Sequence, residues 1–374
     1  MQDMKYLFWY ILFLLMGCNE INKEVKIVFD VNQGKTGDVS EVFEDRKIVF
    51  LETLEESLLT EVTKIICAED RIYILDEPAN SIVVFDTTGK FISAIRPSGR
   101  GPQEYMGISD FTINREKGQL IVHAHRPGKL LFFNLDCRFQ NEIPYKSLVS
   151  AMSWKDGQLI LVNSLQENSP YFTFLSFNDK GEISEKRVSS FKEKINSNQY
   201  TVGSLLLSGE KMTFARRFDN TLYSLEGDRV IPRYILDFNG YNVPVHLLAP
   251  REEEEEKRAE LRKGNYFFSI VNVKETPSSV FFKTNGLGLM RLSKESGRGD
   301  YWVSLKDSEL GISSGNMVGV EDLTNRLFCF EYPLIYVQLS IKGQWERFPE
   351  WFAEKLKRLG DESNPFLIFY TSKE

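Results

Sequence analysis

His123 and His125 are the residues of this 374-residue chain whose type and spacing come nearest to metal chemistry. On a β-strand, alternate side chains share a face, so both imidazoles would point the same way. A zinc site needs at least three protein ligands, and His246 is the only other histidine of the chain. The sequence therefore predicts no metal centre and no cofactor, and His123 and His125 are the only candidate ligands that it offers.

Catalysis by a serine nucleophile or by paired acids has little more support in the sequence than a metal site has. A hydrolase serine stands in a Gly-x-Ser-x-Gly turn, which the chain lacks, and Ser313-Ser314-Gly315 is predicted to be an ordinary turn. The acid pairs Asp70 with Asp76 and Asp219 with Asp228 could perform glycosidic chemistry if they lay close together. Aspartate is also the expected residue in tight turns. We therefore predict no catalytic residue, and an enzyme is the less favoured class.

The glycine-rich stretch from Arg96 to Tyr105, RPSGRGPQEY, has the composition of a phosphate-binding loop. Such a loop opens a helix, so that free backbone amides and the helix dipole face the anion. Here a strand is predicted on each side, at 90–95 and 108–113, and no Lys-Ser/Thr ending follows the glycines. The stretch is therefore predicted to cross from one strand to the next, with Arg100, Glu104 and Tyr105 on the rim of a ligand-binding face.

Aromatic side chains near the predicted strand ends are candidates for stacking on a sugar or clamping a peptide. They are Tyr105, Trp154, Tyr171, Tyr301 and Trp302. Large rings at such positions also fill the space between neighbouring sheets, which is the favoured interpretation for each of them.

Six pairs of short apolar strands recur along the chain, and a polar turn separates the members of each pair. The first members lie at 72–75, 120–122, 159–162, 212–214, 280–282 and 327–330, and the second at 82–85, 130–133, 171–177, 221–225, 288–292 and 334–339. Hairpin turns with Asp86 and Gly89, and with Asn178 and Gly181, indicate a third strand. Upstream strands such as 62–67 and 109–113 give about four strands in each repeat of roughly 40 to 50 residues. The pattern predicts an all-β fold, a six-bladed β-propeller.

Two helices and two terminal strands are expected beside the repeats. Residues 248–264 carry acids first, bases last and a final glycine, which favours an inserted helix. Apolar residues at helical spacing predict a second helix at about 349–359, and a last strand follows at 365–370. Either that strand or residues 25–29 could complete a blade and close the ring, and the N-terminal strand is favoured.

The N-terminus has the form of a secretion signal. Lys5 precedes an apolar run from Tyr6 to Met16, which is shorter than the roughly 20 residues needed to span a bilayer. The run ends at Gly17-Cys18, similar to a bacterial lipobox, with Met16 where a smaller residue is usual. Residues 1–18 are therefore predicted to be a lipoprotein signal peptide, with lipidation at Cys18.

Net charge and the remaining cysteines exclude other classes. The formal charge of −7 and the lack of a basic stripe argue against nucleic-acid binding. Cys67, Cys137 and Cys329 have neither the spacing of a disulfide framework nor that of a zinc site. Cys67 and Cys329 lie in apolar runs and are predicted to be buried.

Several stretches resemble the six-bladed β-propeller lipoproteins of Bacteroides-type bacteria, which are distantly similar to NHL-repeat propellers. These stretches are the lipobox at Cys18, residues 70–95 (DRIYILDEPANSIVVFDTTGKFISAI), the link GRGPQEY at 99–105 with ISDF after it, and the tail NPFLIFYTSK at 364–373. Gln103 stands where the family link usually has glycine. The resemblance implies a fold and an envelope location, and it implies no established activity.

Together these features predict a single propeller domain over residues 19–374, anchored to the outer membrane through an N-terminal lipid, in its periplasmic or its surface-exposed leaflet. The expected function is binding of an envelope partner protein or an extracellular ligand such as a glycan. The alternative is a propeller enzyme, a lyase or hydrolase, with a polar or metal site in the central channel. A purely structural scaffold is a third interpretation.

Overall fold

The computed structural model describes most of the chain downstream of the predicted signal peptide. The described residues are 25–96, 99, 101–163, 171–178, 183–189, 212–216, 219–227, 229–248, 259–261, 263–286, 288–341, 343–360 and 362–374. Cys18, Arg100 and residues 249–258 of the predicted inserted helix lie outside them.

Three four-stranded sheets account for the middle of the chain. The first contains β8 (Gly107–Asn114), β9 (Gln119–Arg126), β10 (Lys129–Asn134) and β11 (Phe139–Pro144), and the second contains β12 (Val149–Lys155), β13 (Gln158–Asn163), β14 (Tyr171–Phe177) and β15 (Ile183–Ser189). The third contains β16 (Met212–Ala215), β17 (Thr221–Glu226) and β18 (Arg229–Asp237), with β1 (Val25–Val28) at its edge.

Two larger sheets contain the remaining strands. One has β19 (Ile270–Glu275), β20 (Ser279–Thr284), β21 (Leu289–Ser293), β22 (Gly299–Asp307) and β2 (Lys35–Asp38), with β23 (Ile312–Ser313) paired to β22. The other runs in the order β3 (Phe43–Phe50), β26 (Phe366–Ser372), β25 (Leu327–Tyr332), β24 (Asn316–Glu321), β4 (Lys64–Ala68), β5 (Arg71–Asp76), β6 (Ser81–Asp86) and β7 (Phe91–Ile95).

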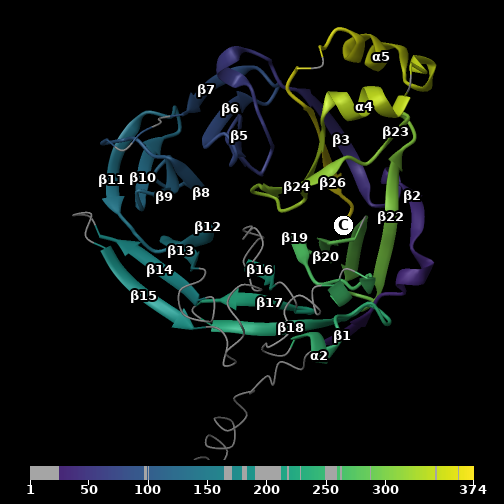
Figure 1. Cartoon of the computed structure of the whole chain (residues 1–374), viewed down its shortest axis with the longest axis horizontal. Coiled ribbons are helices and arrows are strands. Elements are labelled where there is room, and N and C mark those ends of the chain that lie inside the picture. Colours follow the sequence, from purple (N-terminus) through teal and green to yellow (C-terminus); the bar gives the residue numbers. More distant parts are fainter. Residues whose placement is uncertain are drawn as a thin grey trace, which may run out of the picture.

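The sheets follow one another around a ring in chain order, with β8, β12, β16, β19 and β24 nearest the centre (Figure 1). The fold is therefore all-β and propeller-like. In the eight-stranded sheet, β24 and β4 pair in parallel through three residue pairs, from Gly319 with Lys64 to Glu321 with Ile66. Because each sheet has neighbours on both faces, several inner strands contain uninterrupted apolar runs, as in Ile72-Tyr73-Ile74-Leu75, where all four side chains are buried.

Most of the predicted strand pairs lie within observed strands, and one member is wrong. Residues 334–339 belong to helix α4 (Leu334–Ile341). Pro333 cannot donate to a strand neighbour, and its carbonyl accepts from the amides of Tyr336 at 3.1 Å and Val337 at 3.3 Å, which starts a helix. β25 instead pairs with β26 from the end of the chain.

The other helices lie close to where the sequence places them. α5 (Glu350–Lys357) buries Phe352, Ala353 and Leu356. In the predicted insertion, α2 (Val245–Leu248) precedes the undescribed residues, and residues 259–261 are helical. The amide of Gly264 donates to the carbonyl of Glu260 at 2.9 Å, as in a helix that ends at this glycine.

The N-terminal segment adds one strand to each of three successive sheets. β1 pairs in parallel with β18, β2 in parallel with β22, and β3 antiparallel to β26. The last strand of the chain therefore lies between β25 and β3, so the third strand and the last strand share one sheet. The favoured strand at 25–29 completes a different sheet, that of β18, and β3 was not predicted.

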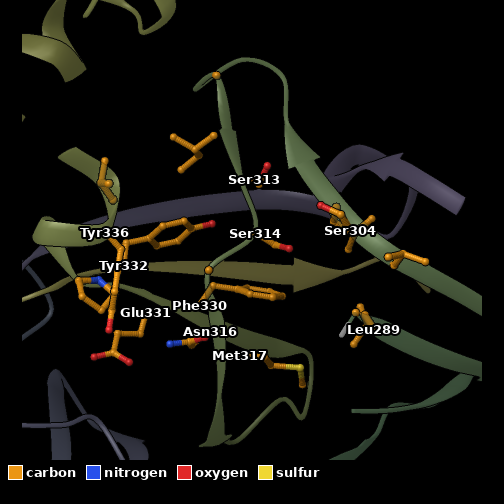
Figure 2. A pocket seen from close by; sticks show the side chains of 18 of the residues that line it. Leu289, Ser304, Ser313, Ser314, Asn316, Met317, Phe330, Glu331, Tyr332 and Tyr336 are labelled. Atoms are coloured by element: carbon orange, nitrogen blue, oxygen red, sulfur yellow. The ribbon is translucent and has the colours of Figure 1, made fainter. Parts of the chain in front are cut away.

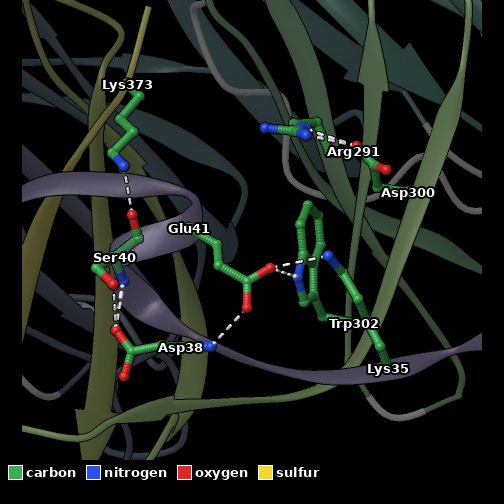
Figure 3. Close-up of polar contacts among 8 residues, drawn as sticks. All are labelled: Lys35, Asp38, Ser40, Glu41, Arg291, Asp300, Trp302 and Lys373. Carbon is green, nitrogen blue, oxygen red and sulfur yellow. Dashed lines mark hydrogen bonds and ion pairs between the residues drawn. The ribbon is translucent and has the colours of Figure 1, made fainter.

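Trp302 of β22 holds this segment in place (Figure 3). Its side chain is 1% exposed, and its indole N–H donates to Oε2 of Glu41 at 3.3 Å. Glu41 also accepts from the Lys35 ammonium at 2.8 Å and the Asp38 amide at 3.0 Å. Lys35 and Arg291 each place a cation 5.1 Å from the centre of the Trp302 ring system. The loop between β2 and β3 is therefore fastened to β22 through Glu41, and Lys35 of β2 adds a cation–π contact with Trp302.

Buried charges join the strands nearest the ring centre. Asp110 of β8 accepts from the ammonium of Lys64 on β4 at 3.0 Å and from the amide of Met152 on β12 at 2.7 Å. Lys274 of β19 donates to the carbonyl of Val320 on β24 at 3.0 Å and to Asp322 at 2.6 Å. Each of these side chains links neighbouring sheets while its charge is satisfied.

Candidate functional site

A pocket of about 780 Å³ opens between the sheet of β19 to β22 and the strands β24 and β25. We call it the serine pocket, after Ser304, Ser313 and Ser314 in its wall. Ser304 belongs to β22, and Ser313 ends β23. Its volume lies within the range of roughly 300 to 1,000 Å³ that is typical of small-molecule sites.

The serine wall is built by a tight return of the chain after β22. Gly311 adopts φ +72°, and a Cβ there would lie 2.3 Å from the carbonyl oxygen of Arg347, so glycine is needed on both counts. The return pairs Ser313 with Lys306, and the amide of Ser314 donates to the carbonyl of Leu305 at 2.7 Å. The backbone that presents the serines is therefore fixed by β22.

The facing wall comes from β25 and α4. Along β25, Phe328, Phe330 and Tyr332 point into the core shared with the sheet of β22, and Phe330 and Tyr332 also line the pocket. Tyr336 of α4 lines it as well and is 66% exposed, so its ring stands at the mouth. Figure 2 shows Ser304, Ser313 and Ser314 on one side of the pocket and Tyr332 and Tyr336 on the other.

Four polar side chains of the serine pocket are uncommitted. Ser304, Ser313, Ser314 and Asn316 line it, and none of their side chains forms a hydrogen bond with another residue in the described part of the chain. Hydroxyl and amide groups both donate and accept hydrogen bonds. Together with the tyrosine rings, they suit a ligand that combines hydroxyl groups with apolar faces.

Two cations also line the pocket, Lys283 of β20 and Arg347 at the end of the 3-10 helix Trp345–Arg347. Neither side chain has an ion pair or hydrogen bond with any other residue that the structure describes. Burial lowers the pKa of Lys283, and no neighbouring charge contributes to the change. The positive charges of Lys283 and Arg347 are therefore not neutralised by any residue that the structure describes.

Glu331 is the one carboxylate among the described lining residues, and its side chain belongs to the opposite face of β25. Its strand neighbour Cys329 packs into the core shared with β4 to β6, and side chains two residues apart share a face. Burial first, and then the charges of Glu61 and Asp76, raise the pKa of Glu331 to about 7. Asp76 ends β5, and Glu61 precedes β4.

The histidine pair contacts a serine. Nδ1 of His123 lies 3.1 Å from the hydroxyl oxygen of Ser109, and Nδ1 of His125 lies 3.5 Å from the same oxygen. His123 is fully buried, and burial lowers its pKa to about 4. Within the described residues, no three His, Cys, Asp or Glu side chains come close enough to hold a metal ion. The side chain of His246 lies outside the described side chains.

The RPSGRGPQEY link lies between strands β7 and β8, as the sequence predicts, and its described residues are 96, 99 and 101–105. Glu104 folds back on the link and accepts from the Gly101 amide at 2.9 Å. Tyr105 is 1% exposed and packs in the core between two sheets, so its predicted place on a rim is wrong. Gln103 adopts φ +68°, a conformation that suits the glycine usual at this position.

The other predicted residues lie apart from the serine pocket. Trp154 and Trp302 are 9% and 1% exposed and fill space in the core, Tyr301 packs against a core cluster, and the Tyr171 side chain is not described. Asp70 precedes the six-residue strand β5 and Asp76 ends it, so they are farther apart than the roughly 5 to 9.5 Å between glycosidase carboxylates. Asp219 pairs with Arg216, and Asp228 is not described.

The cysteines and the helices show two further features. Cys67, Cys137 and Cys329 are free thiols; Cys329 is buried as predicted, and Cys67 is only half-buried. Among the residues that the structure covers, no helix has the length and apolar character needed to cross a membrane.

Sequence reasoning treated Ser313-Ser314-Gly315 as a turn and did not connect it with Ser304 or Lys283. The signal that was available is the density of small residues from Gly311 to Gly315, since a tight return exposes backbone and short polar side chains. The partners in the facing wall come from strand and helix packing, which no spacing rule shows.

Comparison with solved structures finds this fold in a protein that is named as exported. A protein of Bacteroides fragilis NCTC 9343, named as exported, has a TM-score of 0.70 at 18% identity, covering 94% of this chain and 100% of that chain. A DUF4221 member from Bacteroides vulgatus has a TM-score of 0.49 at 12% identity, covering 89% and 97%. A streptogramin B lyase structure has a TM-score of 0.45 at 12% identity, covering 78% and 80%.

The match to B. fragilis supports the all-β, propeller-like fold, and at this identity it supports nothing beyond the fold. A search of curated proteins found no significant match. A family model described as "Domain of unknown function (DUF4934)" matches residues 23–371. Because this match covers nearly the whole chain, the chain belongs to the DUF4934 family.

Proposed function

We propose that this chain is a lipoprotein of the bacterial outer membrane that binds a saccharide in the serine pocket. The observation that carries the proposal is the group of uncommitted polar side chains, Ser304, Ser313, Ser314 and Asn316, around a cavity of about 780 Å³. A saccharide offers many hydroxyl groups for such side chains, and its ring faces stack on aromatic residues such as Tyr336.

The proposed fold is a six-bladed, NHL-like propeller. The eight-stranded sheet counts as two blades, β4 to β7 and β24 to β26 with β3, because only the three-residue parallel contact between β24 and β4 connects them. With the four other sheets, this division gives six blades of four principal strands each. The serine pocket then lies between the fifth and sixth blades.

The proposed anchor is a lipid on Cys18, seven residues before β1 begins at Val25. Seven extended residues reach about 25 Å, so β1 would stand close to the membrane. Labelled palmitate should be incorporated into the wild-type protein and not into Cys18→Ala. Incorporation into the variant would overturn the lipoprotein assignment.

Binding is tested with the full-length protein in detergent, screened against glycan and peptide libraries. Ser314→Trp fills the serine pocket and should abolish saccharide binding, whereas Ser184→Trp, on the exposed strand β15, should leave binding unchanged. Equal binding by the two variants would place the ligand elsewhere. Reproducible turnover of a substrate without stable binding would favour the alternative, a propeller lyase or hydrolase.

The central channel has less support as a site. Of the ionic side chains on the inner strands, Lys64, Asp110 and Lys274 already bond to neighbouring strands. Freeing any of them for catalysis would leave a buried charge without its partner. The serine pocket requires no such rearrangement.

A further inference from the structure

We infer that the ligand of the serine pocket carries an anionic group, a carboxylate or sulfate ester on a saccharide, bound by Lys283 with Arg347 beside the entrance. This inference rests on the proposed function and specifies its ligand class.

The orientation of Lys283 follows from its strand. In β20, Phe281 packs into the core between the sheets of β22 and β25, and Lys283 stands two residues later on the same face. At this level the two sheets separate to form the pocket, which Lys283 lines. Lys283 therefore occupies a position where a core residue would be expected, and its side chain faces the cavity.

The charge around Lys283 is unbalanced. Buried or half-buried lysines are normally paired, as Lys64 is with Asp110 and Lys274 with Asp322 in this same fold. Lys283 has no such partner among the described residues, and burial lowers its pKa with no contribution from a carboxylate. Glu331, the acid of the lining, is influenced by Glu61 and Asp76. An anionic ligand would supply the missing counter-charge.

The remaining groups support a saccharide anion in preference to a bare ion. A small anion would use the ammonium and leave most of a cavity of about 780 Å³ empty. Ser304, Ser313 and Ser314 supply hydrogen-bonding groups across that space, and Tyr336 offers an exposed ring. Arg347 is exposed, so its contribution is weaker and more strongly screened by salt.

The test uses matched pairs of ligands that have the same sugar chain, one charged and one neutral. Tetragalacturonate and its methyl ester represent the carboxylate source, and a sulfated carrageenan tetrasaccharide and its desulfated form represent the sulfate source. Calorimetry with the full-length protein should show tighter binding of a charged member than of its neutral counterpart. If only the galacturonate pair shows this difference in affinity, the anionic group is a carboxylate. If only the carrageenan pair shows it, the group is a sulfate ester.

Lys283→Met keeps most of the length of the side chain and removes its charge. It should weaken binding of the charged saccharide by about 10- to 100-fold, the range expected for loss of a charged hydrogen bond. Binding of the neutral counterpart should change little. The matched control is Lys306→Met, an exposed lysine of β22 outside the pocket lining. A thermal melt shows whether each variant is folded, and Lys283→Gln serves as a second variant.

The outcomes separate the two proposals. If neutral saccharides bind as tightly as charged ones and Lys283→Met has no effect, the inference is overturned and the proposed function stands. If Lys306→Met weakens binding as much as Lys283→Met, the effect is one of overall charge and the inference fails. If no saccharide in the library or in the matched pairs binds, both proposals fail.

Discussion

The ammonium of Lys64 lies 3.0 Å from Oδ1 of Asp110, and the two residues are 2% and 5% exposed. Lys64→Met leaves the carboxylate of Asp110 buried without its cation. We expect the free energy of unfolding, measured in urea, to fall by about 3 to 5 kcal/mol. The double variant Lys64→Met with Asp110→Leu should recover much of that loss, because neither residue of the pair then carries a buried charge.

Lys26 provides the comparison for this pair. It lies 2.7 Å from Asp237, with side chains that are 63% and 29% exposed. Lys26→Met should cost less than about 1 kcal/mol because water screens the pair. Equal losses for Lys26→Met and Lys64→Met would show that the buried pair does not hold the inner strands together.

Glu331 makes stability depend on pH. Its pKa is raised from 4.5 to about 7 in the folded protein, so the folded state retains a proton that the unfolded state releases. This contribution is fully present below about pH 4.5 and is lost as the pH rises to 7. The free energy of unfolding of Glu331→Gln, taken relative to that of wild type, should therefore be about 3 kcal/mol higher at pH 8 than at pH 4. Urea titrations at both pH values measure this, and the exposed Glu362→Gln should show no such trend.

Trp302 should contribute strongly to stability because it packs in the core and fastens the loop after β2. Trp302→Ala should lower the free energy of unfolding by about 3 to 5 kcal/mol and increase amide exchange in residues 35–41. Trp351→Ala is the matched control, since this tryptophan is 54% exposed. If exchange in residues 35–41 does not change in Trp302→Ala, the contacts in Figure 3 are not what holds the segment.

Gln103 should gain from replacement by glycine. Its φ of +68° strains any residue that has a Cβ. Gln103→Gly should raise the free energy of unfolding by up to about 1 kcal/mol, while Gln103→Ala, which keeps the strain, should not. A loss of stability in Gln103→Gly would mean that the side chain makes a contribution larger than the backbone strain.

The repeated strands could be predicted from the sequence because both faces of each sheet are covered. Runs such as Ile72 to Leu75 are apolar at every position. The strands also end at recognisable turn residues: after β6, Asp86 accepts hydrogen bonds from the amides of Thr88 and Lys90. Local chemistry determines these features, so they are visible without the rest of the fold.

Features that depend on distant partners were missed. β3 contains the charged residues Glu44, Asp45, Arg46 and Lys47, and it is a strand because β26 pairs with it. Residues 334–339 have the β-branched and aromatic composition of a strand, yet Pro333 and the packing of Leu334 and Val337 into the core favour a helix. The serine pocket combines both kinds of feature, a local return at Gly311 and a facing wall from α4, and only the return could be seen from the sequence.

The placement of the first strands also determines when the molecule can finish folding. β1 pairs with a strand that ends at Asp237, β2 with one that ends at Asp307, and β3 with one that ends at Ser372. Contacts over such sequence separations form late and slow the folding of a chain. As synthesis proceeds, these three strands are the first to be made and among the last to be paired. A chain that ends before Phe366 would leave β3 without a partner strand and β25 with an open edge, which is a template for aggregation.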